Sequence, residues 1–210
     1  MQMINADRKT TKFLWYRDLF KRVLDICFSL IALIILAIPM LIIAMCIKFD
    51  SKNDPVLFKQ VRIGINDMPF SIYKFRTMKV DAPHQMATEK FHNPEMYITK
   101  IGAKLRKSSL DEIPQLFNVL KGDMSIIGPR PLIPKEKKVL ALRSKYGADK
   151  VLPGITGLAQ VNGRDELVGE KKAKCDGYYA NNASFILDTK ILFKTVDDVI
   201  HSRGIHEGGK

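Results

Sequence analysis

The strongest constraint on this fold is an almost wholly apolar block at residues 23–47. As a straight helix it would measure about 37 Å at about 1.5 Å per residue, enough to cross a hydrocarbon core of about 30 Å. The block is too long for a signal peptide, and no small-residue cleavage site follows it. The sequence therefore predicts a membrane helix.

Two details of this block argue against a simple crossing. Pro39 lies past its middle, where it removes one backbone hydrogen bond and kinks a helix. Both flanks are basic, with Lys21 and Arg22 before the block and Lys48 and Lys52 after it. Because cytoplasmic flanks carry the excess of Lys and Arg, this symmetry favours a helix with both ends on one side. A bent, re-entrant helix and a kinked spanning helix both satisfy the pattern.

The charge of the chain identifies its class of partner. The formal net charge is +12, which implies anionic lipid, nucleic acid or phosphorylated small molecules as partners. Residues 1–22 combine cations with an aromatic cluster, as in segments that settle at lipid headgroups, although a solvated helix is the alternative. We expect no nucleic-acid partner, because no recognised motif is present and the apolar block has no place in such a protein.

The cysteines and histidines predict no metal or disulfide framework. The three cysteines are odd in number and show no close pairing, so we expect reduced thiols. The four histidines lack metal-ligand spacing.

Residues 54–80 predict a β-hairpin, with two β-like runs around the turn signal at residues 64–67. In the second run, alternation places Ile72, Lys74 and Arg76 on one face. Two cations on one strand face could meet a phosphate, or they could form a solvated edge.

The rest of the chain predicts mainly helices and loops, and the fold class is α+β, mainly helical with a small β-hairpin. Composition and periodicity predict four further segments: a loop or insertion at 81–98, a short basic helix near 99–110, a lysine-rich helix at 132–150, and a glycine-punctuated loop at 153–164. Residues 184–200 predict an amphipathic helix that could pack on the core or lie on a bilayer surface.

Two adjacent carboxylates, Asp111 and Glu112, stand out in the central stretch at residues 107–131. Ser109 and Glu112 fit a capping box, in which the acids only complement a helix N-terminus, and Pro114 supports a helix start nearby. The same location also suits chemistry, since helix N-terminal amides stabilise a carboxylate and offer donors to a phosphate. Both interpretations stay open on spacing alone.

The stretch ends with Arg130 held between Pro129 and Pro131. The two fixed φ angles restrict the backbone, so the guanidinium could be aimed at a phosphate at low entropic cost. A rigid turn with a solvated arginine is the alternative.

Together these stretches resemble the bacterial sugar transferases, and more narrowly the small monotopic phosphoglycosyl transferases. The matching segments are KRVLDI, FKQVRIG, IYKFRTM, SSLDEIPQLFNVLKGDMSIIGPRP, and PGITGLAQVNGR through YYANNASFILDTKI. The resemblance implies transfer of a phospho-sugar from a UDP-sugar to undecaprenyl phosphate with release of UMP, the first membrane step in the assembly of a bacterial surface glycan or glycoprotein glycan. It also implies a re-entrant helix at residues 23–48, a cytoplasmic catalytic domain at 49–210 and interfacial amphipathic helices, on the cytoplasmic face of the bacterial inner membrane.

The resemblance further assigns catalytic roles. Asp111 matches the nucleophile that forms an acyl-phosphate intermediate, and Glu112 matches its partner in the dyad, as a base toward the lipid phosphate or as an organiser of the metal site. Mg²⁺ is the expected cofactor, with Asp111 among its contacts.

Arg130 and Arg106 match family positions near the substrate phosphates, with Pro129 beside them and Lys74 as a weaker candidate. Pro39 is the expected helix break, but Ile38 precedes it where some members carry serine. The resemblance leaves open whether the chain forms a homodimer. A non-enzymatic, single-span membrane protein that binds lipid headgroups is the alternative function.

Overall fold

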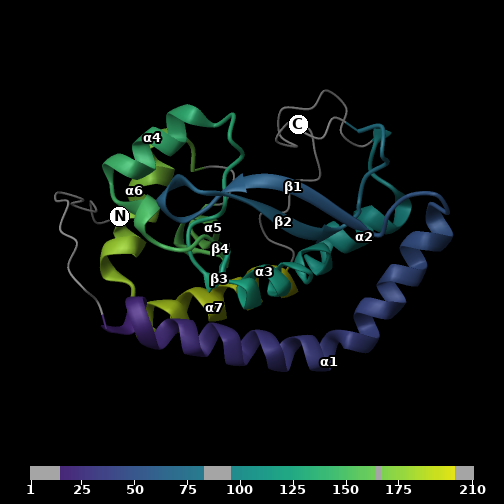
Figure 1. The fold of residues 1–210 in the computed structure, drawn as a ribbon, viewed down its shortest axis with the longest axis horizontal. Helices are drawn as coiled ribbons and strands as arrows, with labels where there is room; N and C mark the ends of the chain where they lie inside the picture. The colour runs from purple at the N-terminus through teal and green to yellow at the C-terminus, as the bar shows by residue number, and fades with distance from the viewer. Residues whose placement is uncertain (1–14, 83–95, 164–166, 202–210) are drawn as a thin grey trace.

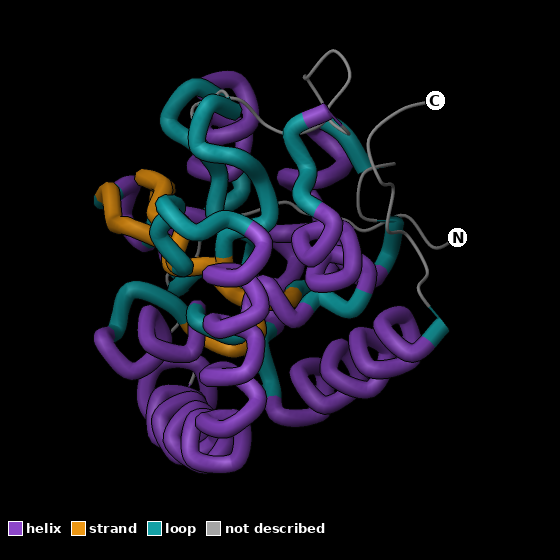
Figure 2. Tube along the Cα trace, turned by 90° about the vertical axis from the view of Figure 1, so that its right-hand side faces the viewer, coloured by secondary structure: helices purple, strands orange, loops and turns teal. Residues whose placement is uncertain are grey.

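The computed structural model describes residues 15–82, 96–163 and 167–201, and most of these residues are helical (Figures 1 and 2). The helices are α1 (Lys21–Asp50), α2 (Lys100–Lys107), α3 (Gln115–Lys121), α4 (Lys137–Lys145), α5 (Leu158–Val161), α6 (Gly169–Asn182) and α7 (Phe185–Ile200). The strands are β1 (Leu57–Ile63), β2 (Pro69–Phe75), β3 (Ser125–Ile127) and β4 (Gly154–Thr156). The prediction of a mainly helical chain with a small β-hairpin is confirmed.

The predicted apolar helix is present as α1, which continues a π-helical turn at Tyr16–Phe20. It is long and apolar enough to cross a membrane, and only 6% of its most apolar window is buried. Figure 1 shows α1 bending past its middle, and Pro39 inside the helix is the expected cause. Side chains such as Ile34 and Ile38 remain about 70% exposed, which is typical of a surface that contacts lipid.

The first turns of α1 are fixed to the C-terminal helices by buried charges. The Lys21 Nζ lies 2.7 Å from the Asp188 carboxylate of α7 and 3.6 Å from that of Asp25. The Tyr179 hydroxyl of α6 lies 2.8 Å from the same Asp188 carboxylate. The carboxylate of Asp25 also accepts a hydrogen bond from the Ile126 amide of β3. Since every charge has a partner, the network can hold α1 at a fixed position on the domain.

The far end of α1 packs on the same domain. Ile47 is 4% exposed and forms a core cluster with Phe75 of β2 and Leu105 of α2. Both ends of α1 are therefore attached to one domain, while the bent, apolar middle remains largely uncovered.

The predicted hairpin is confirmed, with β1 and β2 antiparallel and Leu57 opposite Phe75. Its face assignment was correct only in part. Ile72 is buried and Lys74 reaches the dyad described below, but Arg76 neither meets the site nor forms a solvated edge. Strand β2 ends at Phe75, so the alternation of the strand does not extend to Arg76. The Arg76 Nε donates to the Pro55 carbonyl at 2.7 Å.

The hairpin turn places two non-glycine residues in the left-handed region, Asn66 at φ 52° and Asp67 at φ 59°. The Met68 amide donates to the Ile65 carbonyl at 3.1 Å, so this is a type I′ turn, which favours Asn-Gly. We expect Asp67→Gly to raise the free energy of unfolding by about 0.5–1 kcal/mol, measured by denaturant titration in detergent micelles. Asp67→Asn is the control, with little change. A lower unfolding midpoint for Asp67→Gly would contradict this account of the turn.

The C-terminal half corrects two predictions. The segment at 153–164 is not a loop: it contains β4, parallel to β3, and the short helix α5. A Cβ on Gly154 would lie 2.1 Å from the Gly128 amide nitrogen, so the glycine serves a close backbone approach. The lysine-rich helix is shorter than expected, because α4 ends at Lys145 and a 3₁₀ turn follows at Ala148–Lys150.

The amphipathic helix α7 has two apolar faces. Ile191 is 1% exposed in a core cluster with Ile127, while Ile186 and Phe193 are about 70% exposed. It therefore packs on the core and also presents apolar side chains to its surroundings. Cys27, Cys46 and Cys175 are free thiols, as expected. The predicted basic segment at 1–22 and the loop at 81–98 lie mostly outside the described residues.

Candidate active site

The two carboxylates lie in a 3₁₀ turn, Leu110–Glu112, between α2 and α3. The capping-box prediction is wrong. Ser109 has a φ of 56° and its side chain caps no amide, so the turn does not begin an α-helix. Helix α3 starts only after Pro114, as the proline suggested. Neither acid is therefore used as a helix cap.

Glu112 is held by two cations from other parts of the chain. Its Oε1 lies 2.6 Å from the Lys74 Nζ of β2 and 3.4 Å from the Arg130 Nη1. Burial raises the pKa of the Glu112 carboxyl, but Lys74 and Arg130 outweigh it and hold that pKa well below its usual range. The hairpin, the 3₁₀ turn and the Pro129-Arg130-Pro131 segment thus meet at one carboxylate.

Asp111 has the opposite environment. It is 8% exposed, and among the residues that the structure describes its carboxylate forms no hydrogen bond or salt bridge. Burial raises the pKa of the Asp111 carboxyl, and nearby Lys74 offsets this only in part. Two neighbouring carboxylates whose pKa values are displaced in opposite directions are typical of a catalytic pair.

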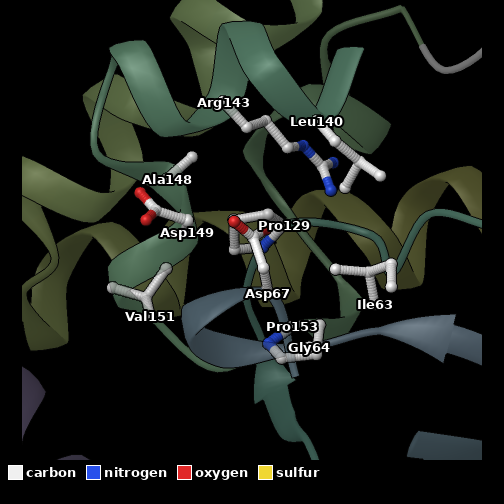
Figure 3. A pocket seen from close by; sticks show the side chains of 10 residues that line it. All are labelled: Ile63, Gly64, Asp67, Pro129, Leu140, Arg143, Ala148, Asp149, Val151 and Pro153. Atoms are coloured by element: carbon white, nitrogen blue, oxygen red, sulfur yellow. The ribbon is translucent and has the colours of Figure 1, made fainter. Parts of the chain in front are cut away.

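Of the other predicted site residues, Arg106 acts on the dyad, whereas Pro129 and Pro39 lie elsewhere. Arg106, in the last turn of α2, donates from Nε to the Thr77 hydroxyl at 3.0 Å, and its charge acts on Asp111. Pro129 instead lines a small separate pocket together with Asp67 and Arg143, and the dyad is not among the lining residues (Figure 3). Pro39 lies inside α1, so its predicted role concerns the membrane helix.

The dyad could hold a metal ion only together with a ligand. Within the described ranges, no group of three or more His, Cys, Asp or Glu side chains could hold a metal ion. Mg²⁺ is commonly bound by one or two carboxylates plus substrate phosphates and water. Asp111, whose carboxylate has no hydrogen-bond or ion-pair partner within the described ranges, is the side chain that fits this manner of binding, whereas Glu112 is engaged by Lys74.

Two residues near the site were missed in the sequence. Arg143 of α4 and Asp176 of α6 form a buried ion pair behind Arg130. The sequence offered little to identify them. Asp176 is a single carboxylate between Cys175 and Gly177, in a segment for which the sequence analysis predicted no helix.

Comparisons with known proteins place these residues in a family context. The family model described as bacterial sugar transferase matches residues 16–202. The protein named "Uncharacterized sugar transferase EpsL" from Bacillus subtilis is 46% identical over 74% of this chain and 75% of its own length. An undecaprenyl-phosphate glucose phosphotransferase from Komagataeibacter xylinus is 40% identical over 87% of this chain and 36% of its own length.

A third relative matches a comparable share of this chain. The UDP-glucose:undecaprenyl-phosphate glucose-1-phosphate transferase from Klebsiella pneumoniae is 42% identical over 84% of this chain. The match spans 39% of that protein, so this chain covers less than half the length of the two relatives with named substrates.

Proposed function

This chain belongs to the bacterial sugar transferase family, and from that premise we propose that it transfers a phospho-sugar from a UDP-sugar to undecaprenyl phosphate, forming a polyprenyl diphosphosugar and UMP. The observation that carries the proposal is the dyad: Asp111 is a buried carboxylate with no hydrogen-bond or ion-pair partner in the described part of the chain, and the adjacent Glu112 holds two cations. Relatives named for glucose-1-phosphate transfer to this lipid support the substrate class.

In the first step, a carboxylate oxygen of Asp111 attacks the sugar-bearing phosphorus. A new O–P bond forms as the bond to the bridging oxygen breaks, and UMP leaves with that oxygen. Arg130 and Arg106 offset the charge of the donor's diphosphate as it approaches an anionic nucleophile. In the second step, an oxygen of the lipid phosphate attacks the same phosphorus and releases the Asp111 carboxylate.

Glu112 acts in this scheme as an organiser and not as a base. A carboxylate with a depressed pKa binds a proton weakly, which makes it a poor general base near neutral pH. Its contacts at 2.6 Å and 3.4 Å keep Lys74 and Arg130 beside the nucleophile.

Mg²⁺ is the proposed cofactor. Asp111 would hold it together with phosphate oxygens of the donor, because no described side chain occupies its carboxylate. When bound, the ion would supply positive charge to the diphosphate and so ease departure of UMP.

The membrane helix supports a monotopic arrangement, with α1 as a re-entrant helix and the catalytic domain on the cytoplasmic face of the bacterial inner membrane. Both ends of α1 pack on the same domain, through Lys21 at one end and Ile47 at the other. A helix that spanned the bilayer would have its ends on opposite sides of a hydrocarbon core about 30 Å thick, so one domain on one side could not contact both ends. The exposed apolar side chains of α7 and the basic N-terminal segment would lie at the interface with anionic lipids.

The function is tested by UMP release from a panel of UDP-hexoses and UDP-N-acetylhexosamines, with Mg²⁺ and undecaprenyl phosphate in detergent micelles. We expect turnover with at least one donor and formation of a lipid-linked diphosphosugar. A folded protein that releases no UMP from any donor would favour the non-enzymatic alternative.

The raised pKa of Asp111 predicts an acid limb in the pH profile. The nucleophile must be ionised, so activity is present above its pKa and is lost as pH falls through a value above the usual aspartate range of about 3.9. Lys74→Met removes a cation that favours the ionised form of Asp111, so we expect the acid limb of kcat/KM for the donor to move to higher pH. Lys59→Met is the control, because Lys59 stacks on Tyr73 on the other face of the hairpin. If the acid limb of Lys74→Met lay at the same pH as that of wild type, Lys74 would have no effect on the ionisation of Asp111.

A further inference from the structure

The backbone around Arg130 is held by donors from three different elements. The Pro129 carbonyl accepts from the Gly154 amide of β4 at 3.0 Å. The Arg130 carbonyl accepts from the Arg143 Nη1 of α4 at 2.8 Å, and the Pro131 carbonyl accepts from Arg62 of β1 at 3.1 Å. Prolines have no amide hydrogen, so this segment cannot be fixed by an ordinary strand ladder and depends on its carbonyls.

Arg143 is itself fixed by a buried carboxylate. Its Nε and Nη2 lie 2.8 Å and 2.6 Å from the Asp176 Oδ2 of α6. The side chains are 7% and 1% exposed, so the pair is almost fully removed from water. Arg143 lines the same small pocket as Pro129 (Figure 3). The remaining nitrogen, Nη1, faces the Arg130 carbonyl.

A buried ion pair is weak evidence for stability, because desolvation offsets most of the attraction between the charges. Its geometry is specific, however, since the Nε hydrogen bond to Asp176 limits how the planar guanidinium can turn and so fixes the direction of its other donors. Here that direction points to the backbone of the residue whose side chain reaches Glu112. The Arg130 side chain is 40% exposed, and its Nη1 lies 3.4 Å from the Glu112 Oε1.

We propose that Arg143, clamped by Asp176, is a positioning residue that fixes the Arg130 backbone so that its guanidinium is aimed at the dyad and the donor phosphates. The proposal rests on the proposed function. It assigns Arg143 and Asp176 no contact with the substrate, and predicts that their effect on catalysis passes through Arg130. A displacement of about 1 Å in a substrate-positioning group can cost about a hundredfold in rate.

The decisive experiment is a double-mutant cycle on kcat/KM for the UDP-sugar. We expect Arg143→Met to lower kcat/KM by about 10–100-fold in the wild-type background but by less than about threefold when Arg130 is already alanine. Arg143→Lys, which keeps one charge but loses the fork, is expected to fall between wild type and Arg143→Met. An equal loss in both backgrounds would show that Arg143 acts independently of Arg130, and the proposal would be wrong.

Two further measurements guard against misfolding and against an inactive wild type. The double substitution Arg143→Met with Asp176→Leu replaces the pair by apolar side chains, so we expect a near-normal unfolding midpoint with the same catalytic loss. Hydrogen exchange of the full chain in micelles is read on peptides from residues 126–136, where we expect at least about tenfold faster exchange than in wild type. Lys138→Ala, an exposed α4 position, is the matched control.

The outcomes separate the two ideas. A wild type without turnover would refute the proposed function, whereas unchanged exchange in residues 126–136 would refute the positioning role whether or not the enzyme turns over. Faster exchange together with coupling in the cycle would support both.

Discussion

Asp111→Asn is expected to lower UMP release by at least about a thousandfold, because an amide cannot form the acyl-phosphate bond. The variant should fold at least as well as wild type. Burial raises the pKa of Asp111, so the ionised carboxyl costs stability at neutral pH, and asparagine removes that charge with little change in shape. A large loss of activity without loss of stability is therefore the expected combination, measured by UMP release and thermal unfolding in the same detergent.

Asp50→Asn is the matched control for this variant. It removes one exposed carboxylate, at the last residue of α1, and should leave turnover within about twofold. Turnover by Asp111→Asn above about a tenth of the wild-type rate would be incompatible with Asp111 as the nucleophile.

Arg130→Ala is expected to reduce kcat/KM for the donor by about 10²–10³-fold, the usual cost of removing a preorganised group that stabilises developing charge. The loss has two sources. The donor phosphates lose a cation, and Glu112 loses one of its two cationic contacts while keeping Lys74 at 2.6 Å. Membrane association should not change, because α1 and α7 carry the exposed apolar surface. Both quantities are measurable by kinetics and by vesicle flotation.

Arg130→Lys separates charge from geometry, since it keeps the charge but not the planar fork, and an intermediate loss is expected. The exposed Lys138→Ala controls for a general reduction in positive charge. Near-normal turnover of Arg130→Ala would remove Arg130 from the site.

Features encoded by local pattern could be predicted from the sequence. The apolar block predicted α1 because composition over such a length has few other solutions. The hairpin followed from two β-like runs around a turn signal, and the start of α3 followed from Pro114. The dyad was found because two adjacent acids stood beside rigid segments, although spacing alone could not separate a cap from a catalytic pair.

Features set by tertiary contacts were not predictable in the same way. Strands β3 and β4 pair in parallel, with Ser125 opposite Gly154. Each strand has only three residues, which is too short to show a periodicity in the sequence. The capping box failed because Ser109 adopts a left-handed conformation that its sequence context does not reveal. The Arg143–Asp176 pair joins two helices distant in the chain, and ordinary spacing rules do not reach such contacts.

The central claim is a covalent route through Asp111, and it is tested most directly by UMP release with Mg²⁺ and the active UDP-sugar but without polyprenyl phosphate. The account predicts a burst close to one UMP per active enzyme, no burst from Asp111→Asn, and continued turnover once the lipid is added. Release of UMP only when both substrates are present would contradict it, because the phospho-sugar would then pass directly from donor to lipid.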